Sequence, residues 1–229
     1  MIRGFLFSAA LLLHHFSIQA QDAVGSSPYS GGTKVIVYTS SGAALYENPD
    51  PKAKVKQSIP MGTVLTILDD SENPVPLTAD KIAGHWAKVT YPKGWGYVFD
   101  GYLSRLPLNS ERMLIEEYLA SNFKPVETVT NVPDISVQQY ERTRYDNGIV
   151  YEFRQFKNSS TTTITVDKGV ISIKEMLLLL KFSNPEYFTR NKSCSYTANY
   201  ISCTTADSSS SVTIETKKDK TILIEDVMD

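Results

Sequence analysis

The residues that most often carry out catalysis are scarce in this chain, and histidine is the scarcest of them. The 229 residues include three histidines, two of which, His14 and His15, fall in the apolar segment at the beginning of the chain. If that segment is removed, His85 is the remaining imidazole. Two-histidine zinc sites then become impossible, and any Ser-His or Cys-His pair must use His85. We therefore predict no catalytic residue, no metal site and no cofactor.

Two pairs of adjacent acidic residues, Asp69-Asp70 and Glu116-Glu117, could in principle supply the carboxylates of a glycosidase. Neighbouring side chains on a strand or a helix point in different directions, so neither pair is arranged to act on one bond. We interpret both pairs as solvated surface. The sequence also contains no phosphate-binding P-loop and no nucleophile elbow.

Cys194 and Cys203 lie at the two ends of a short tyrosine-rich stretch. In an exported chain two such cysteines most often pair with each other across a hairpin. The closed loop of about ten residues would stabilise the fold by roughly 2.5–3 kcal/mol in the chain-entropy model. The alternative is a catalytic thiol, which would need His85 as its base. We predict the disulfide.

Short runs with β-strand character alternate with turns rich in Pro, Gly, Asn and Asp between residues 33 and 107. The runs comprise residues 34–38, 62–68, 85–91 and 96–99. Strands of this length, separated by turn signals, predict a small antiparallel barrel.

Seven aromatic residues fall in this predicted barrel: Tyr46, Trp86, Tyr91, Trp95, Tyr97, Phe99 and Tyr102. A small barrel can bury only a few large rings, because alternate residues along a strand face outward. Exposed aromatic patches usually mark contact surfaces, so we take Tyr46, Trp86, Trp95 and Tyr97 as candidates for ligand contact. Tyr46 and Trp95 are favoured, since Trp86, Tyr97 and Tyr102 have the alternative of a core or corner position.

Four motifs between Ala44 and Leu106 are similar to those of the bacterial SH3-like domain family. They are residues 44–49 (ALYENP), 59–65 (IPMGTVL), 85–89 (HWAKV) and 96–103 (GYVFDGYL), which resemble the opening strand, the Gly-Thr step, the Trp-x-x-Val strand and the closing strand. The resemblance implies a small β-barrel that binds a cell-wall peptide or a partner protein. Tyr97 departs from it by replacing the usual tryptophan.

Residues 108–229 follow a different pattern, for which we identify no family resemblance. Asn109-Ser110 can cap a helix with an apolar stripe, and Lys124-Pro125 would end it. Ser172 and Glu175 form a capping box before a run of apolar residues, which predicts a second, buried helix. Strands are predicted on both sides of Asp146-Asn147-Gly148, at 161–166, around residue 196, and at 200–204, 212–216 and 221–227. An α+β domain with two helices on an antiparallel sheet is the simplest fit.

The first twenty residues have the features of a secretory signal peptide. A positive charge at Arg3 precedes a nine-residue apolar run, and the small residue Ala20 lies near the predicted cleavage site. The run is shorter than the roughly 20 residues that cross a membrane, and the alternative is a buried N-terminal helix. Residues 21–32 are Gly/Ser-rich and are predicted to form a flexible leader. The mature chain should be periplasmic or extracellular, with no membrane span.

These observations predict two domains, a barrel at 33–107 and an α+β domain of unknown family at 108–229. The formal net charge of -2 removes the broad positive surface expected of a nucleic-acid binder. We expect an exported, non-enzymatic binding or scaffold protein that recognises a peptide, a cell-wall component or a protein partner through aromatic residues. One alternative is a cell-wall hydrolase that uses carboxylates alone, with the barrel as its targeting module. Another is an inhibitor of a different enzyme.

Overall fold

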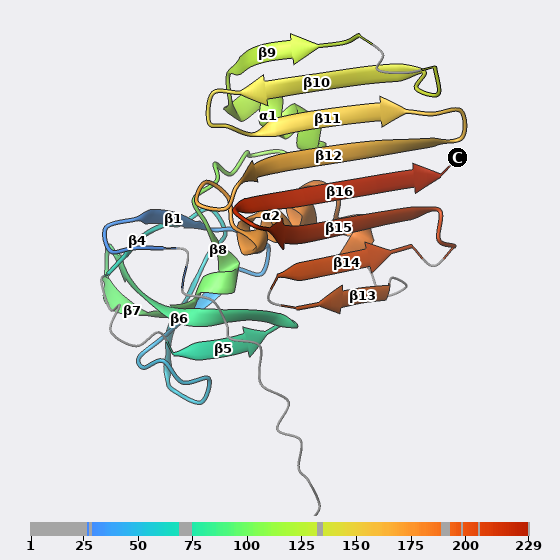
Figure 1. The fold of residues 1–229 in the computed structure, drawn as a ribbon. Coiled ribbons are helices and arrows are strands. Elements are labelled where there is room, and N and C mark those ends of the chain that lie inside the picture. The colour runs from blue at the N-terminus through green and yellow to red at the C-terminus, as the bar shows by residue number, and fades with distance from the viewer. Residues whose placement is uncertain are drawn as a thin grey trace, which may run out of the picture.

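The structure is a computed structural model that describes residue 27 and residues 29–68, 75–131, 135–188, 193–197, 199–205 and 207–228. The predicted signal peptide, most of the predicted leader and the pair Asp69-Asp70 lie outside the described residues. In the described part, the chain forms two eight-stranded antiparallel sheets and two α-helices, as Figure 1 shows. The predicted antiparallel β-structure and the two predicted helices are confirmed.

The N-terminal sheet is built from eight short strands: β1 (Lys34–Val37), β2 (Ala43–Tyr46), β3 (Val55–Ile59), β4 (Val64–Ile67), β5 (Pro76–Ala79), β6 (Ile82–Tyr91), β7 (Gly94–Phe99) and β8 (Leu103–Ser104). Their hydrogen-bonded order is β3-β2-β7-β6-β4-β1-β8, and β5 pairs with β6. A 3-10 turn, η1 (Asp100–Tyr102), joins β7 to β8. Alternate residues of these strands, including Leu45, Leu65, Val89 and Val98, are fully buried in a core of their own.

The C-terminal sheet contains β9 (Pro125–Val129), β10 (Gln139–Tyr145), β11 (Val150–Gln155), β12 (Ser159–Asp167), β13 (Ser193–Tyr196), β14 (Tyr200–Thr204), β15 (Ser210–Lys217) and β16 (Lys220–Met228). Their order is β13-β14-β15-β16-β12-β11-β10-β9. The hairpin between β10 and β11 turns at the predicted Asn147-Gly148, where Gly148 has a φ of +84° that a glycine adopts without strain.

The C-terminal sheet consists of two units with the same arrangement. The first unit is α1 (Ile115–Asn122) followed by β9 to β12, and the second is α2 (Ile173–Ser183) followed by η2 (Pro185–Phe188) and β13 to β16. In each unit the strands run in order from the outer edge of the sheet to its centre, where β12 pairs with β16. The sequence analysis did not identify this repetition.

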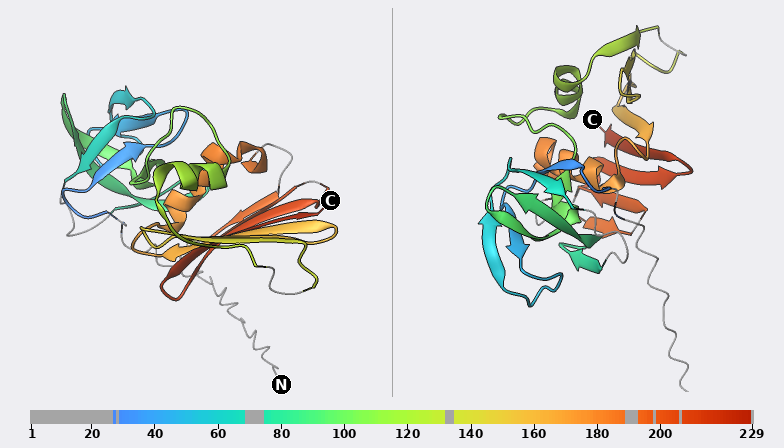
Figure 2. Two further views of the ribbon diagram at one scale, coloured as in Figure 1. Left: turned by 90° about the horizontal axis from the view of Figure 1, so that it is seen from above. Right: turned by 90° about the vertical axis from the view of Figure 1, so that its left-hand side faces the viewer.

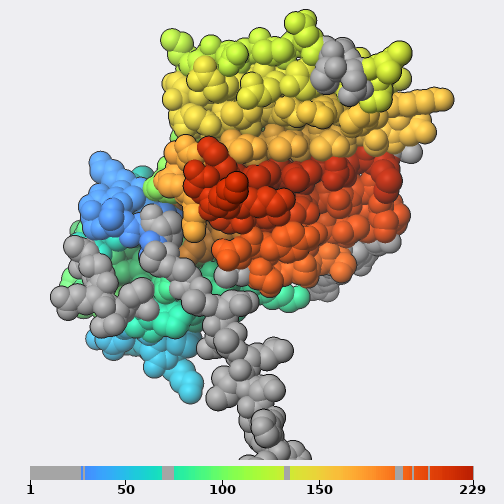
Figure 3. Space-filling model, in the orientation of Figure 1, coloured from blue at the N-terminus to red at the C-terminus, as the bar shows by residue number. Residues whose placement is uncertain are grey.

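The helix α2 lies between the two sheets, while both helices cover one face of the C-terminal sheet (Figure 2). Its four consecutive leucines, residues 177–180, are 0–2% exposed. They belong to one core that also includes Phe99 of the N-terminal sheet and Ile214 of the C-terminal sheet. An apolar helix with neighbours on both sides has no face to turn to water, so its predicted burial is confirmed. The opposite face of the C-terminal sheet forms a broad surface without helices (Figure 3).

The two helices begin differently from each other. Ser172 caps α2 as predicted, since its hydroxyl accepts a hydrogen bond from the Glu175 N–H at 3.3 Å and its own N–H donates to the Glu175 carboxylate at 3.0 Å. The helix α1 begins at Ile115, after Leu114, and not directly after Asn109-Ser110. Leucine offers no side-chain acceptor, so only the reverse half of the cap forms, from the Leu114 N–H to the Glu117 carboxylate at 3.1 Å.

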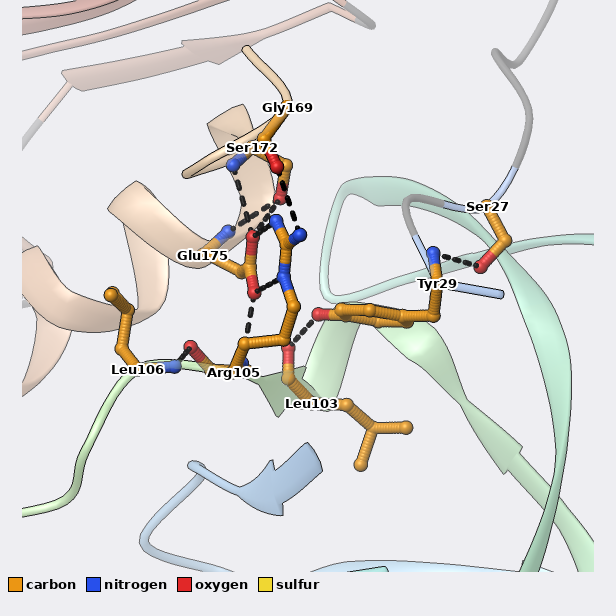
Figure 4. Close-up of polar contacts among 9 residues, drawn as sticks. Ser27, Tyr29, Leu103, Arg105, Leu106, Gly169, Ser172 and Glu175 are labelled. Atoms are coloured by element: carbon orange, nitrogen blue, oxygen red, sulfur yellow. Dashed lines mark hydrogen bonds and ion pairs between the residues drawn. The ribbon is translucent and has the colours of Figure 1, made fainter. Parts of the chain in front are cut away.

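An ion pair buried at α2 joins the two sheets. The Glu175 side chain is 0% exposed and accepts hydrogen bonds from Arg105 at the backbone N–H (2.8 Å), Nε (2.9 Å) and Nη2 (2.6 Å), as Figure 4 shows. Arg105 follows β8 directly, and its Nη1 also donates to the Gly169 carbonyl at 2.9 Å. Tyr29, within the predicted leader, is buried nearby and donates to the Leu103 carbonyl. The Glu175 carboxylate is therefore satisfied jointly by Arg105 of the N-terminal half and by Ser172 of its own helix cap.

Candidate functional site

Most of the predicted aromatic residues lie on one face of β2, β6 and β7. In the antiparallel register Trp86 is opposite Phe99, Lys88 is opposite Tyr97, and Thr90 is opposite Trp95. Tyr46 of β2 pairs with Tyr97 on its other side. Residues opposite each other in a sheet share a face, so these side chains project together, away from the core formed by the intervening residues. We call the surface formed by Tyr46, Trp86, Trp95 and Tyr97 the aromatic face.

Gly96 allows the strands of the aromatic face to lie close together. A Cβ atom at this position would meet the Leu45 Cγ and the Tyr46 carbonyl oxygen, each at 2.7 Å. Any larger residue would push β2 away from β7 and separate Tyr46 from Tyr97. The glycine of the predicted closing motif therefore has a specific packing role.

Exposure increases along the aromatic face from Trp86 to Trp95. Trp86 is 8% exposed, Tyr46 and Tyr97 are partly exposed, and Trp95 is 47% exposed. The rings meet edge to face in two pairs, Tyr46 with Trp86 at a centroid distance of 4.9 Å and Trp95 with Tyr97 at 6.2 Å. Trp86 thus occupies the core position that was its predicted alternative, and it supports Tyr46. Trp95 is the most accessible aromatic side chain of the aromatic face.

Two lysines that the sequence analysis did not single out surround Trp95. The Lys56 Nζ lies 4.7 Å from the centroid of the Trp95 ring and donates a hydrogen bond to the Trp95 carbonyl at 2.8 Å. The Lys88 Nζ lies 5.2 Å from the same centroid and 5.9 Å from that of Tyr97. Ammonium groups over a ring are attracted by its negative face. They also make the exposed end of the aromatic face positively charged. The alternation on β6 places Lys88 beside the rings, but Lys56 comes from β3, far away in sequence.

His85 does not belong to the aromatic face. It is 3% exposed, and its backbone N–H donates to the Asp100 Oδ1 at 2.9 Å while its Nδ1 lies 3.7 Å from Oδ2. Asp100 is 0% exposed and forms an ion pair with Lys174 of α2 at 2.7 Å. Burial acts to raise the pKa of Asp100, but hydrogen bonding from His85 and the charge of Lys174 outweigh it and lower the pKa below its ordinary value. His85 thus supports the buried Asp100 where the N-terminal sheet contacts α2.

The predicted disulfide is confirmed. Cys194 and Cys203 are opposite each other on β13 and β14, with their sulfur atoms bonded at 2.13 Å. The bond joins the two outermost strands of the second unit, and both thiols are consumed by it. Neither cysteine can therefore act as a nucleophile in this state.

Neither a metal site nor a membrane-spanning helix is found in the part of the chain that the structure describes. No group of three or more His, Cys, Asp or Glu side chains there is placed to hold a metal ion. No helix among the described residues is both long and apolar enough to cross a membrane.

A family model for the bacterial SH3 domain matches residues 41–104. The match contains all four residues of the aromatic face and both lysines around Trp95, and it ends at the last residue of β8. The predicted resemblance of this region is thereby confirmed. No curated protein and no solved structure matches the chain.

Proposed function

We propose that this chain is an exported, non-enzymatic binding protein that uses the aromatic face to hold an extended peptide, either of the cell wall or of a partner protein. A bacterial SH3 domain suggests a cell-wall or peptide-binding module. The observation that carries the proposal is Trp95, whose ring is 47% exposed between two lysines at the end of the aromatic face. Rings of this kind grip extended peptides by stacking, and lysines favour ligands that carry carboxylates.

In this proposal the chain has two domains, a barrel at 33–107 and an α+β domain at 108–229. The barrel supplies the recognition surface, and the α+β domain acts as a scaffold or as a second interaction module. Cleavage near Ala20 would release the mature chain to the periplasm or the exterior, which agrees with the disulfide between Cys194 and Cys203. Sequencing the N-terminus of the secreted protein tests this point, and retention of residues 1–20 would contradict it.

The proposed function is tested by co-sedimentation of the mature chain with purified cell wall. Trp95→Ala should weaken binding about 5- to 30-fold, as expected for an aromatic anchor worth about 1–2 kcal/mol. Because Trp95 is about half exposed, the free energy of unfolding of the Trp95→Ala variant should stay within about 1 kcal/mol of the wild-type value. Val64→Ala is the matched control, since Val64 is 53% exposed on β4 of the same sheet but outside the aromatic face.

The same experiment separates the proposed function from its alternatives. Equal binding by wild type and Trp95→Ala would remove the aromatic face from the proposal. Release of soluble wall fragments by the wild type would identify a hydrolase instead of a binder. If the chain ignores the wall but forms a stoichiometric complex with one enzyme in a pull-down, the inhibitor alternative replaces the cell-wall ligand.

A further inference from the structure

A pocket of about 480 Å³ lies in the first unit, between α1 and the strands β10 and β11. It is remote in sequence from the aromatic face and lies in the α+β domain, to which the proposed function assigns no ligand. Its lining combines carboxylates with aromatic rings: Glu116, Glu117, Ala120, Gln139, Glu141, Tyr145, Tyr151 and Phe153. We call it the acidic pocket. Its volume is in the range of sites that hold small molecules.

The three carboxylates of the acidic pocket have no cationic partner among the described residues. Glu116 accepts a hydrogen bond from the Tyr151 hydroxyl at 3.4 Å, Glu117 accepts one from the Leu114 N–H, and Glu141 accepts one from the Thr143 hydroxyl at 3.1 Å. Other glutamates of the same sheet are paired, as Glu127 is with Arg144 at 3.2 Å. The pocket therefore concentrates negative charge that the described part of the chain does not balance.

Tyrosine rings form the buried wall of the acidic pocket. Tyr145 is 5% and Tyr151 is 6% exposed. Burial first, and then the charges of Glu116 and Glu141, raise the pKa of both hydroxyls above their ordinary value. The hydroxyls thus stay protonated at neutral pH, and Tyr151 donates to a carboxylate instead of adding charge. Aromatic rings that lie beside carboxylates attract cations in two ways: the ring quadrupole attracts them, and so does the negative charge of the carboxylates.

The second unit shows that the fold does not require this opening. The nine pairs between the central strands are centred on Thr163 and Ile224, so these two residues correspond to each other. Counted from there, Tyr151 and Phe153 of β11 correspond to Val212 and Ile214 of β15. Glu141, opposite Phe153, corresponds in the same way to Ile201, opposite Ile214. These counterparts are 1–5% exposed, in the core that α2 covers.

The helices differ in the same sense. Counted from the residue before each helix, Ala120 of α1 corresponds to Leu178 of α2, which is 2% exposed. A small residue on the helix and polar residues on the strands replace the apolar filling of the second unit. The acidic pocket is thus a local departure from a close-packed arrangement that the same chain builds elsewhere.

We propose that the acidic pocket binds an organic cation with an aliphatic stem, an alkylammonium or alkylguanidinium of the kind carried by lysine and arginine side chains. The rings of Tyr145, Tyr151 and Phe153 would cover the apolar stem, and Glu116 and Glu141 would receive the charged end. An uncharged ligand would leave these carboxylates without a partner, and an anion would be repelled by them. A free amine and the side chain of a bound peptide share this chemistry.

Titration of the mature chain by calorimetry at low salt tests the proposal with three probes. N-acetyl-lysine methylamide and pentane-1,5-diamine represent the peptide and the free amine, and N-acetyl-norleucine methylamide has a similar stem without charge. The lysine probe or the diamine should bind at least 10-fold more tightly than the norleucine probe, and the tighter of the two identifies the source. Their binding should weaken as salt is added.

The variants Glu116→Gln and Glu141→Gln should each weaken binding of the cationic probe at least 5-fold. Glu111→Gln is the matched control, because it removes the same charge from an exposed position that is not part of the pocket lining and should leave the affinity unchanged. Thermal melts confirm that each variant is folded. Glu117→Gln is not used for this purpose, since its carboxylate caps α1.

Three results would overturn the proposal. One is the absence of binding by either cation at millimolar concentration, and another is equal affinity for the norleucine probe. The third is an equal loss of affinity in Glu111→Gln, which would indicate general surface charge instead of a site. None of these results bears on the cell-wall experiment, because the acidic pocket and the aromatic face are probed by different residues.

Discussion

The helices α1 and α2 start with the same local contact and end in opposite environments. In each helix, the glutamate three residues after the N-cap accepts a hydrogen bond from the backbone N–H of the N-cap residue. Glu117 accepts it from Leu114 in α1, and Glu175 accepts it from Ser172 in α2. Glu175 is 0% exposed and is neutralised by Arg105 of the N-terminal half. Glu117 is exposed and lies at the acidic pocket.

The difference shows that a tertiary partner, and not the cap, decides what a helix start becomes. Arg105 turns the start of α2 into a buried joint between the two sheets, and Lys174 adds a second ion pair there with Asp100. At α1 the position of Lys174 is taken by Glu116, so the charge at the helix start is reversed. One unit of the C-terminal sheet is thus committed to internal packing, and the other keeps an opening to solvent.

The largest effect is expected from making the same substitution in both helices. Glu175→Gln leaves Arg105 with an uncompensated charge in a partly buried position and should lower the free energy of unfolding by about 3–5 kcal/mol. Glu117→Gln weakens only an exposed cap and should cost less than about 1 kcal/mol. Urea denaturation of the two variants measures both values. Similar losses would show that the two helix starts are not different in the way described.

A smaller effect is expected from the pH dependence of the joint at α2. The pKa of Asp100 is lowered in the folded chain, so the unfolded chain binds the proton at higher pH than the folded chain does. The stability that Asp100 contributes is therefore complete above about pH 4, the ordinary pKa of an aspartate, and is lost as the pH falls through its folded pKa. Asp100→Asn should reduce the slope of unfolding free energy against pH below pH 4, by at most about 1.4 kcal/mol per pH unit. Equal slopes for variant and wild type would contradict this.

The smallest effect on stability is expected from giving the first unit the residue of the second. Ala120→Leu gives α1 the residue type that α2 has at the corresponding position, Leu178, and so places a leucine side chain over the acidic pocket. Alanine and leucine both favour a helix. The unfolding free energy should change by less than about 0.5 kcal/mol, while binding of the cationic probe should weaken at least 3-fold. Ser121→Leu, one position further on α1 and outside the pocket lining, is the control for both measurements. Unchanged probe binding in Ala120→Leu would show that the probe does not bind in the acidic pocket.

Much of the fold could be predicted from the sequence because its signals are local. The capping box of Ser172 and Glu175, the apolar run after it and the turn at Asn147-Gly148 each fit within a few residues, and the structure confirms each of them. The start of α1 could not be predicted in the same way, because Leu114 is not a residue type that caps a helix. Its cap comes from Glu117, a residue that the sequence pattern alone indicates only as solvated surface.

The candidate site could be predicted in its residue types but not in its exposure. Alternation along β6 and β7 places the rings on one face, and the motifs of the family resemblance point to the same strands. The ring of Trp86, which is 8% exposed, packs edge to face against Tyr46, a residue 40 positions earlier in the chain, at a centroid distance of 4.9 Å. The joint at α2 depends on pairs 70 and 74 residues apart, Arg105 with Glu175 and Asp100 with Lys174. Contacts between residues so far apart cannot be predicted from a local sequence pattern.

The direct passage of the chain from β8 into Arg105 has a consequence for ligands that carry more than one recognition group. Because Arg105 directly after β8 is held by Glu175 of α2, the aromatic face and the acidic pocket should keep a fixed spacing and direction. A molecule that bears a peptide for one and an amine for the other gains affinity only if its own span matches that spacing. A series of peptide-amine molecules with tethers of increasing length would then show one optimal tether length, so the protein would select such ligands by their length.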